Sequence, residues 1–101
     1  MGKQEIKEKV RKAIEQNTYK KDIQKVSLFG SYLHGTAKED SDVDVLVEFT
    51  DDSHISLFDL VGMKYELEDS IGKPVDLLTP ESLSRFFRDE VINEAELIYE
   101  K

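Results

Sequence analysis

The spacing of hydrophobic residues changes along the chain, and each spacing predicts a different element. Over residues 3–16 apolar residues recur three and four positions apart with charged residues between them, which predicts an amphipathic helix. Residues 56–70 show the same spacing, and Gly72 and Pro74 are expected to end this second helix. Its buried face is expected to contain five apolar residues: Leu57, Leu60, Val61, Leu67 and Ile71.

Shorter segments follow the period of two that is typical of β-strands. Residues 42–49 alternate and are rich in valine, and three apolar runs at 26–29, 75–78 and 96–99 are also expected to form strands. A short helix is expected over residues 31–37. A last helix should begin near Thr79–Pro80 and bury four apolar residues: Leu83, Phe86, Phe87 and Val91. The order of elements predicts an α/β (α+β) fold, in which helices flank a small mixed β-sheet.

Two acidic residues stand at the start of the most regular strand segment. Asp42 and Asp44 are two positions apart, so their side chains point to one side of the strand, while the valines between and after them point to the other. Two carboxylates held this close repel one another unless protons or cations lie between them. Mg²⁺ prefers carboxylate oxygens and keeps coordination positions for water and phosphate. The pair predicts a metal-dependent site for phosphate chemistry, with a solvated strand start as the simpler alternative.

Further residues extend this candidate site. Asp76 lies inside the apolar segment 75–78, where a charge is costly unless it faces a site or a partner. If that strand lies beside 42–49, three carboxylates can hold two Mg²⁺ ions. Gly30 and Ser31 follow the strand at 26–29, where backbone N–H groups and a hydroxyl would bind the terminal phosphates of a nucleotide. An exposed edge-strand acid and a helix cap are the simpler alternatives for Asp76 and Ser31.

Composition narrows the function classes. The chain has 101 residues, which predicts one domain over residues 1–101, and it has no cysteine, which excludes disulfides and thiolate metal sites. Its net charge of −8 argues against stable nucleic-acid binding, whereas a nucleotide held through metal or a basic protein partner is compatible with it. There is no apolar run of membrane-spanning length and no secretory signal, so we expect a cytoplasmic location and no membrane contact.

These motifs together resemble a known family. The stretches Leu28–Tyr32, Gly35–Ala37 and Ser41–Phe49, followed by Asp76, are similar to the pattern of the minimal nucleotidyltransferases (MNT) of bacteria and archaea. That family is part of the nucleotidyltransferase superfamily that includes DNA polymerase beta, and the resemblance extends from the first helix to Tyr99. It implies the DNA polymerase beta-like nucleotidyltransferase fold.

The resemblance also implies an activity. A nucleoside monophosphate, expected to be AMP from ATP, would pass to an acceptor hydroxyl with two Mg²⁺ ions as cofactors. Asp42 and Asp44 would bind both metals, Asp76 would be the third ligand and lie nearest the attacking hydroxyl, and Gly30 and Ser31 would bind the nucleotide. Family members are commonly encoded beside a HEPN-domain protein and act as antitoxins, and some transfer AMP to a tyrosine of that toxin. The resemblance thus implies a HEPN-type partner and a toxin–antitoxin system.

One position departs from the family pattern. The family often has Arg just before the second glycine of this motif, where this chain has His34, and histidine is mostly neutral near pH 7. Phosphate binding would then be weaker, or Lys38 would substitute. Two other interpretations stay open: a catalytically degenerate antitoxin that neutralises its partner by contact, and nucleotidyl transfer to a small molecule such as an antibiotic. The patterns do not identify the acceptor or exclude a homo-oligomer.

Overall fold

The computed structural model describes residues 2–101, and its elements follow one another in the expected order. The helices are α1 (Lys3–Glu15), α2 (Ser31–His34), α3 (Leu57–Ile71) and α4 (Arg88–Glu94). The strands are β1 (Ile23–Phe29), β2 (Val43–Phe49), β3 (Val75–Leu78) and β4 (Glu96–Glu100), with 3-10 turns η1 (Lys20–Asp22) and η2 (Pro80–Ser82). Most boundaries match the prediction within two residues, but β1 begins earlier, α2 ends earlier and α4 begins later than expected.

The four strands form one mixed sheet in the order β3-β2-β1-β4, so β3 and β4 are its edges. β1 pairs antiparallel with β2 and with β4, whereas β2 and β3 are parallel. β4 therefore runs in the same direction as β2 and β3. This arrangement confirms the small mixed sheet with flanking helices that the order of elements predicted.

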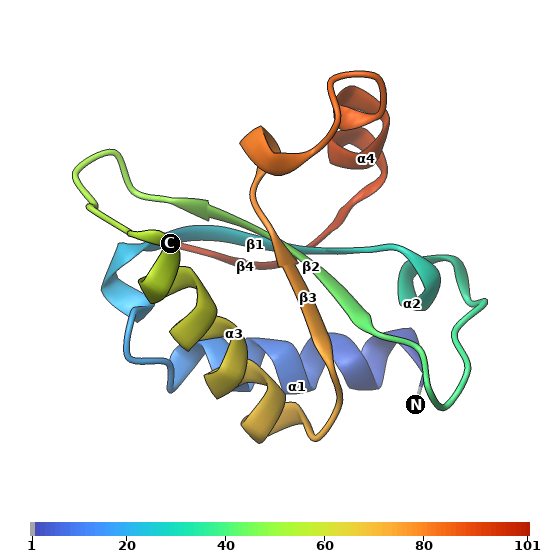
Figure 1. Ribbon diagram of the computed structural model, residues 1–101. Helices are drawn as coiled ribbons and strands as arrows, with labels where there is room; N and C mark the ends of the chain where they lie inside the picture. Colours follow the sequence, from blue (N-terminus) through green and yellow to red (C-terminus); the bar gives the residue numbers. More distant parts are fainter. Residues whose placement is uncertain (1) are drawn as a thin grey trace.

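Two connections between parallel strands decide which face of the sheet is covered. The connection from β2 to β3 contains α3 and moves toward one edge, whereas the connection from β3 to β4 contains α4 and moves toward the other. Because such crossovers are right-handed, the two connections must lie on opposite faces of the sheet. Figure 1 shows this arrangement, with α1 and α3 on one side and the segment containing η2 and α4 on the other.

The core lies between the sheet and the two long helices. Alternate residues of β2, Val43, Val45 and Val47, are fully buried there. They belong to one hydrophobic cluster with the buried residues of both helices: Ile6, Val10, Ala13 and Ile14 of α1, and Met63, Leu67 and Ile71 of α3. The predicted buried face of α1 is thus confirmed. Each fully buried valine, leucine or isoleucine contributes about 1.5–3 kcal/mol, so burial in this layer is a large favourable contribution to folding.

The predicted buried face of α3 is only partly correct. Leu67 and Ile71 are buried, but Leu57 is 75% exposed, Val61 is 39% exposed, and Met63 lies in the core. Apolar residues occur around most of this helix, so the helical period does not choose one face. The sheet and α1 select the face that carries Met63.

No helix within residues 2–101 has the length and apolar content needed to cross a bilayer.

The last helix is the second correction. It begins at Arg88, and Phe86 and Phe87, which were expected to be buried, are exposed in the loop before it. The Arg88 guanidinium donates hydrogen bonds to the carbonyls of Pro80 and Leu83, at 2.8 and 3.1 Å, which keeps this stretch folded back as a loop. The core face of the sheet is already covered by α1 and α3, and on the opposite face Leu46 is buried while both phenyl rings stay exposed.

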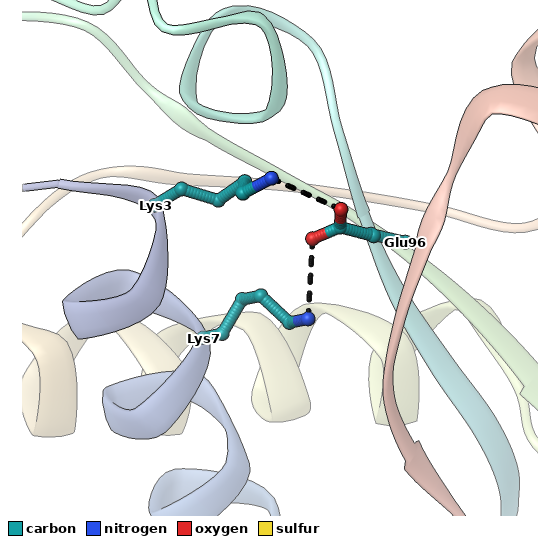
Figure 2. Close-up of polar contacts among 3 residues, drawn as sticks. All are labelled: Lys3, Lys7 and Glu96. Carbon is teal, nitrogen blue, oxygen red and sulfur yellow. Dashed lines mark hydrogen bonds and ion pairs between the residues drawn. The ribbon is translucent and has the colours of Figure 1, made fainter.

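An ion-pair cluster ties α1 to the start of β4. The Nζ atoms of Lys3 and Lys7 lie 3.0 and 3.1 Å from the two carboxylate oxygens of Glu96, as Figure 2 shows. Hydrogen bonds from the two lysines lower the pKa of Glu96. Such partly exposed pairs contribute little to stability. Their structural consequence is that the chain is held in place where it returns from α4 to the sheet.

Candidate functional site

Asp44 and Asp76 lie opposite each other on neighbouring parallel strands. Each is the second residue of its strand, and the register pairs Asp44 directly with Asp76. Their neighbours Val43, Val45 and Val75 are buried toward the helices. Because side chains alternate along a strand, both carboxylates lie on the face that α1 and α3 leave open. The condition on which the three-carboxylate prediction depended, that the strand at 75–78 lies beside the strand at 42–49, is met.

Gly30 and Ser31, which follow the end of β1, lie next to Asp44. Phe29 of β1 pairs with Asp44, so the chain turns into α2 immediately beside it. Gly30 has φ +76°, which favours glycine, and a Cβ added there would overlap the Asp44 side chain. The backbone N–H of Ser31 also acts on this carboxyl group and lowers the pKa of Asp44. The predicted phosphate-binding residues and one predicted metal ligand are therefore in direct contact.

The pKa of Asp44 is raised from its ordinary value of 3.8 to about 6. Burial of the carboxyl group is the largest cause, followed by the negative charges of Asp76 and then Asp42, while the hydrogen bond from Ser31 acts in the opposite direction. Asp42 precedes β2, and both it and Asp76 are exposed. A half-buried carboxylate among like charges is in the electrostatic condition that a bound cation relieves.

The chemistry of these three residues fits a divalent cation. They offer only carboxylate oxygens, which Mg²⁺ prefers, and the charges of Asp42 and Asp76 act on Asp44. Over the described part of the chain, residues 2–101, no three acidic or histidine side chains stand close enough together to form a ready-made ion site. Carboxylates that repel one another stay apart, and a cation between them would draw them together.

A contact that sequence patterns did not reveal links α2 to α4. His34 Nε2, at the end of α2, lies 3.3 Å from a carboxylate oxygen of Glu94 at the end of α4. Both side chains are about half exposed, so the pair contributes little to stability. No spacing rule could connect two residues so far apart in the chain. The contact shows that α4 ends beside α2, which begins at Ser31.

The chain is similar to known proteins over most of its length. Residues 7–98 match the family model described as nucleotidyltransferase domain. MJ0435 of Methanocaldococcus jannaschii, by its name a candidate protein adenylyltransferase, is 48% identical over 73 residues, which cover 72% of this chain and 76% of the relative. The protein adenylyltransferase MntA of Thermococcus cleftensis is 39% identical over 72 residues, which cover 71% of each chain.

Solved structures share the fold. A structure described as a candidate minimal nucleotidyltransferase matches with a TM-score of 0.75 at 32% identity, and the match covers 94% of both chains. A chain from the complex of the tri-AMPylated HEPN toxin of Shewanella oneidensis with an MNT antitoxin matches with a TM-score of 0.68 at 20% identity. That second match covers 98% of this chain and 73% of the other, and it shows the fold alone. The expected nucleotidyltransferase fold is confirmed.

Proposed function

Because the chain belongs to the nucleotidyltransferase domain family and is a nucleotidyltransferase, we propose that it transfers AMP from ATP to a hydroxyl group of a HEPN-type protein and so acts as an antitoxin. The observation that carries the proposal is the register that pairs Asp44 with Asp76 beside Gly30 and Ser31. Relatives named as protein adenylyltransferases support AMP as the transferred group. The AMPylated HEPN toxin in the structurally similar complex supports the class of partner.

In this proposal each residue has a separate task. The backbone N–H and hydroxyl of Ser31 bind the β- and γ-phosphates, and Gly30 lets the chain approach them closely. Asp42, Asp44 and Asp76 would hold two Mg²⁺ ions, which would neutralise phosphate charge and lower the pKa of the acceptor hydroxyl. With a pKa of about 6, Asp44 is mostly ionised near pH 7 and is available as a ligand.

The transfer step forms one bond and breaks one. The acceptor oxygen attacks the α-phosphorus of ATP, the bond from that phosphorus to the oxygen that bridges the α- and β-phosphates breaks, and pyrophosphate leaves with that oxygen. The proton of the hydroxyl passes to the carboxylate of Asp76, which is exposed and therefore reachable from the side of the acceptor. The product is a phosphodiester between AMP and the partner.

Label transfer from ATP marked at the α-phosphate tests the proposal, with the HEPN-domain protein of the same genome as acceptor. Asp44→Asn and Asp76→Asn should each slow transfer roughly 100-fold or more, because ligands that stabilise transition-state charge contribute several kcal/mol. Glu48→Gln is the matched control, since Glu48 lies on the same face of β2 but four residues further along. The proposal fails if the wild-type protein binds this acceptor and no label enters it.

Neutralisation by contact alone is a second candidate, and the exposed apolar side chains favour it. Phe86 is 79% exposed and Phe87 61% exposed, which suits a protein that covers a partner. The two candidates differ in what Asp44→Asn does to cells that produce the toxin. A contact antitoxin keeps protecting such cells when Asp44 is replaced, whereas an enzyme stops protecting them.

A further inference from the structure

The connection from β3 to β4 exposes large apolar side chains. Phe86 is 79% exposed, Phe87 61% and Ile92 40%. Single exposed apolar residues are ordinary on protein surfaces, but two adjacent and largely exposed phenylalanines are typical of an interaction site. These three residues, called here the crossover surface, take no part in the proposed chemistry.

The backbone beneath the crossover surface is held in place. The Ser82 hydroxyl accepts from the Thr79 N–H at 3.0 Å and donates to the Thr79 carbonyl at 2.8 Å. Arg88 donates to the carbonyls of Pro80 and Leu83, and the Phe87 N–H donates to the carbonyl of Ser84 at 2.9 Å. Exposed rings on an ordered backbone lose less conformational entropy when they bind, which favours a preformed docking surface over a flexible tail.

One chain connection and two contacts place this connection beside the candidate active site. It begins directly after β3, which carries Asp76, and its 3-10 turn η2 packs against β2, which carries Asp44. Near its other end, Glu94 contacts His34 of α2, the helix that begins at Ser31. Figure 1 shows the connection on the side of the sheet opposite α1 and α3. A protein bound to the crossover surface would therefore approach the face on which the carboxylates lie.

We propose that the crossover surface docks the acceptor protein and presents its hydroxyl to the carboxylates. The inference rests on the proposed function and adds where the partner binds and which chemistry recognises it.

The charge around the crossover surface specifies the partner. Residues 79–95 contain four acidic and two basic side chains, namely Glu81, Asp89, Glu90, Glu94, Arg85 and Arg88. The guanidinium of Arg88 is already engaged with backbone carbonyls, and the whole chain carries a net charge of −8. The complementary partner is a HEPN-type protein with an apolar patch bordered by basic residues, which the negative field would attract over a distance.

A second exposed apolar pair offers a matched control. Leu57 is 75% exposed and Phe58 89% exposed, both on α3, which lies on the opposite side of the sheet from the crossover surface. Replacing this pair removes a comparable apolar area. It leaves the approach to the carboxylates untouched.

The test compares Phe86→Ser/Phe87→Ser with Leu57→Ser/Phe58→Ser, and the probe is the HEPN-domain protein of the same genome. Calorimetry without ATP measures the dissociation constant of the HEPN-domain protein from each variant, and labelled ATP measures the rate of AMP transfer. The Phe86/Phe87 variant should bind about tenfold more weakly or worse and transfer correspondingly less at low acceptor concentration, because exposed aromatics at an interface often dominate its affinity. Its affinity for Mg-ATP and its melting temperature should match the wild type, and the Leu57/Phe58 variant should match it in every measurement.

Each other outcome has a separate meaning. Unchanged binding by the Phe86/Phe87 variant, with normal AMP transfer, overturns the docking surface and leaves the proposed function standing. Weakened binding without any transfer by the wild type supports the docking surface and refutes the proposed function. A wild-type dimer that this variant dissociates, with partner binding unchanged, assigns the surface to a second copy and overturns the inference. If the double variant melts lower, Phe86→Ser alone replaces it, because that side chain has few contacts to lose.

Discussion

The two connections between parallel strands differ in what they bury. The connection through α3 places Met63, Leu67 and Ile71 in the core, each no more than 3% exposed. The connection through α4 contains a helix with no buried residue and exposes Phe86 and Phe87. Both contain a helix, and both link parallel strands of the same sheet.

The difference follows from the two faces of β2. The valines on one face require an apolar cover, and α3 supplies it together with α1. The other face carries Asp44, beside Asp76 of β3, and an apolar cover there would remove carboxylates from water at a high cost in free energy. A connection that crosses this face must leave the carboxylates accessible. Phe86, Phe87 and Ile92 of this connection stay exposed and are available to another protein.

Core substitution should separate the two connections most strongly. Leu67→Ala in α3 is expected to lower the free energy of unfolding by about 2–5 kcal/mol, because it leaves a cavity in the packed layer. Ile92→Ala in α4 removes a side chain that is 40% exposed and should cost less than about 1 kcal/mol. Urea unfolding measures both values. Equal losses would mean that α4 is part of the core after all.

Loss of the Arg88 hydrogen bonds should loosen only the second connection. Arg88→Met is expected to lower global stability by about 1–2 kcal/mol at most, since the bonds are partly exposed. Hydrogen exchange at the Phe87 and Arg88 amides, which donate to Ser84, should accelerate. Arg85→Met is the control, because the Arg85 guanidinium lies over the Phe86 ring, 5.2 Å from its centroid. Unchanged exchange in the Arg88 variant would show that the loop is ordered by other contacts.

The smallest expected effect is a pH dependence of the stability of the protein that comes from Asp44. The pKa of Asp44, about 6 in the folded protein, lies above its ordinary value of 3.8, so the folded state holds this proton more tightly. The stabilisation of the folded state by protonated Asp44 is complete below pH 3.8 and is lost as pH rises through 6. The difference in free energy of unfolding between Asp44→Asn and the wild type should therefore shift by about 1 kcal/mol in favour of the variant from acidic to neutral pH. This value allows for solvent screening of a half-exposed group.

Denaturant unfolding at several pH values measures this gain, and Mg²⁺ provides an internal check. Above pH 6, added Mg²⁺ should raise the melting temperature of the wild type but not of the Asp42→Asn/Asp44→Asn double variant. A constant difference between wild type and Asp44→Asn from acidic to neutral pH would contradict the electrostatic description of the site.

Sequence patterns predicted local structure well where one period or one cap dominated. The helix over 3–16 has a single apolar face, and Gly72 adopts the left-handed conformation with φ +79° that a helix C-cap requires. The spacing of Asp42 and Asp44 and the acid within the strand at 75–78 were sufficient to identify the candidate site. Their assignment as metal ligands stays a prediction.

Patterns were insufficient where a segment had more than one apolar face. α3 carries Leu57 and Val61 on one side and Met63 and Leu67 on another, and only packing against α1 and the sheet distinguishes them. Phe86 and Phe87 look like core residues by type. Their exposure depends on which face of the sheet their connection crosses.

The sequence alone therefore determined the order of the elements, the Gly72 cap, the family and the carboxylates of the candidate site, because these depend on residues close together in the chain or on motif spacing. Tertiary structure decided the pairing of Asp44 with Asp76, the raised pKa of Asp44, the contact of His34 with Glu94 and the exposure of the crossover surface. Each of these depends on residues that are distant in the chain. The strand order and the right-handed crossovers bring those residues together.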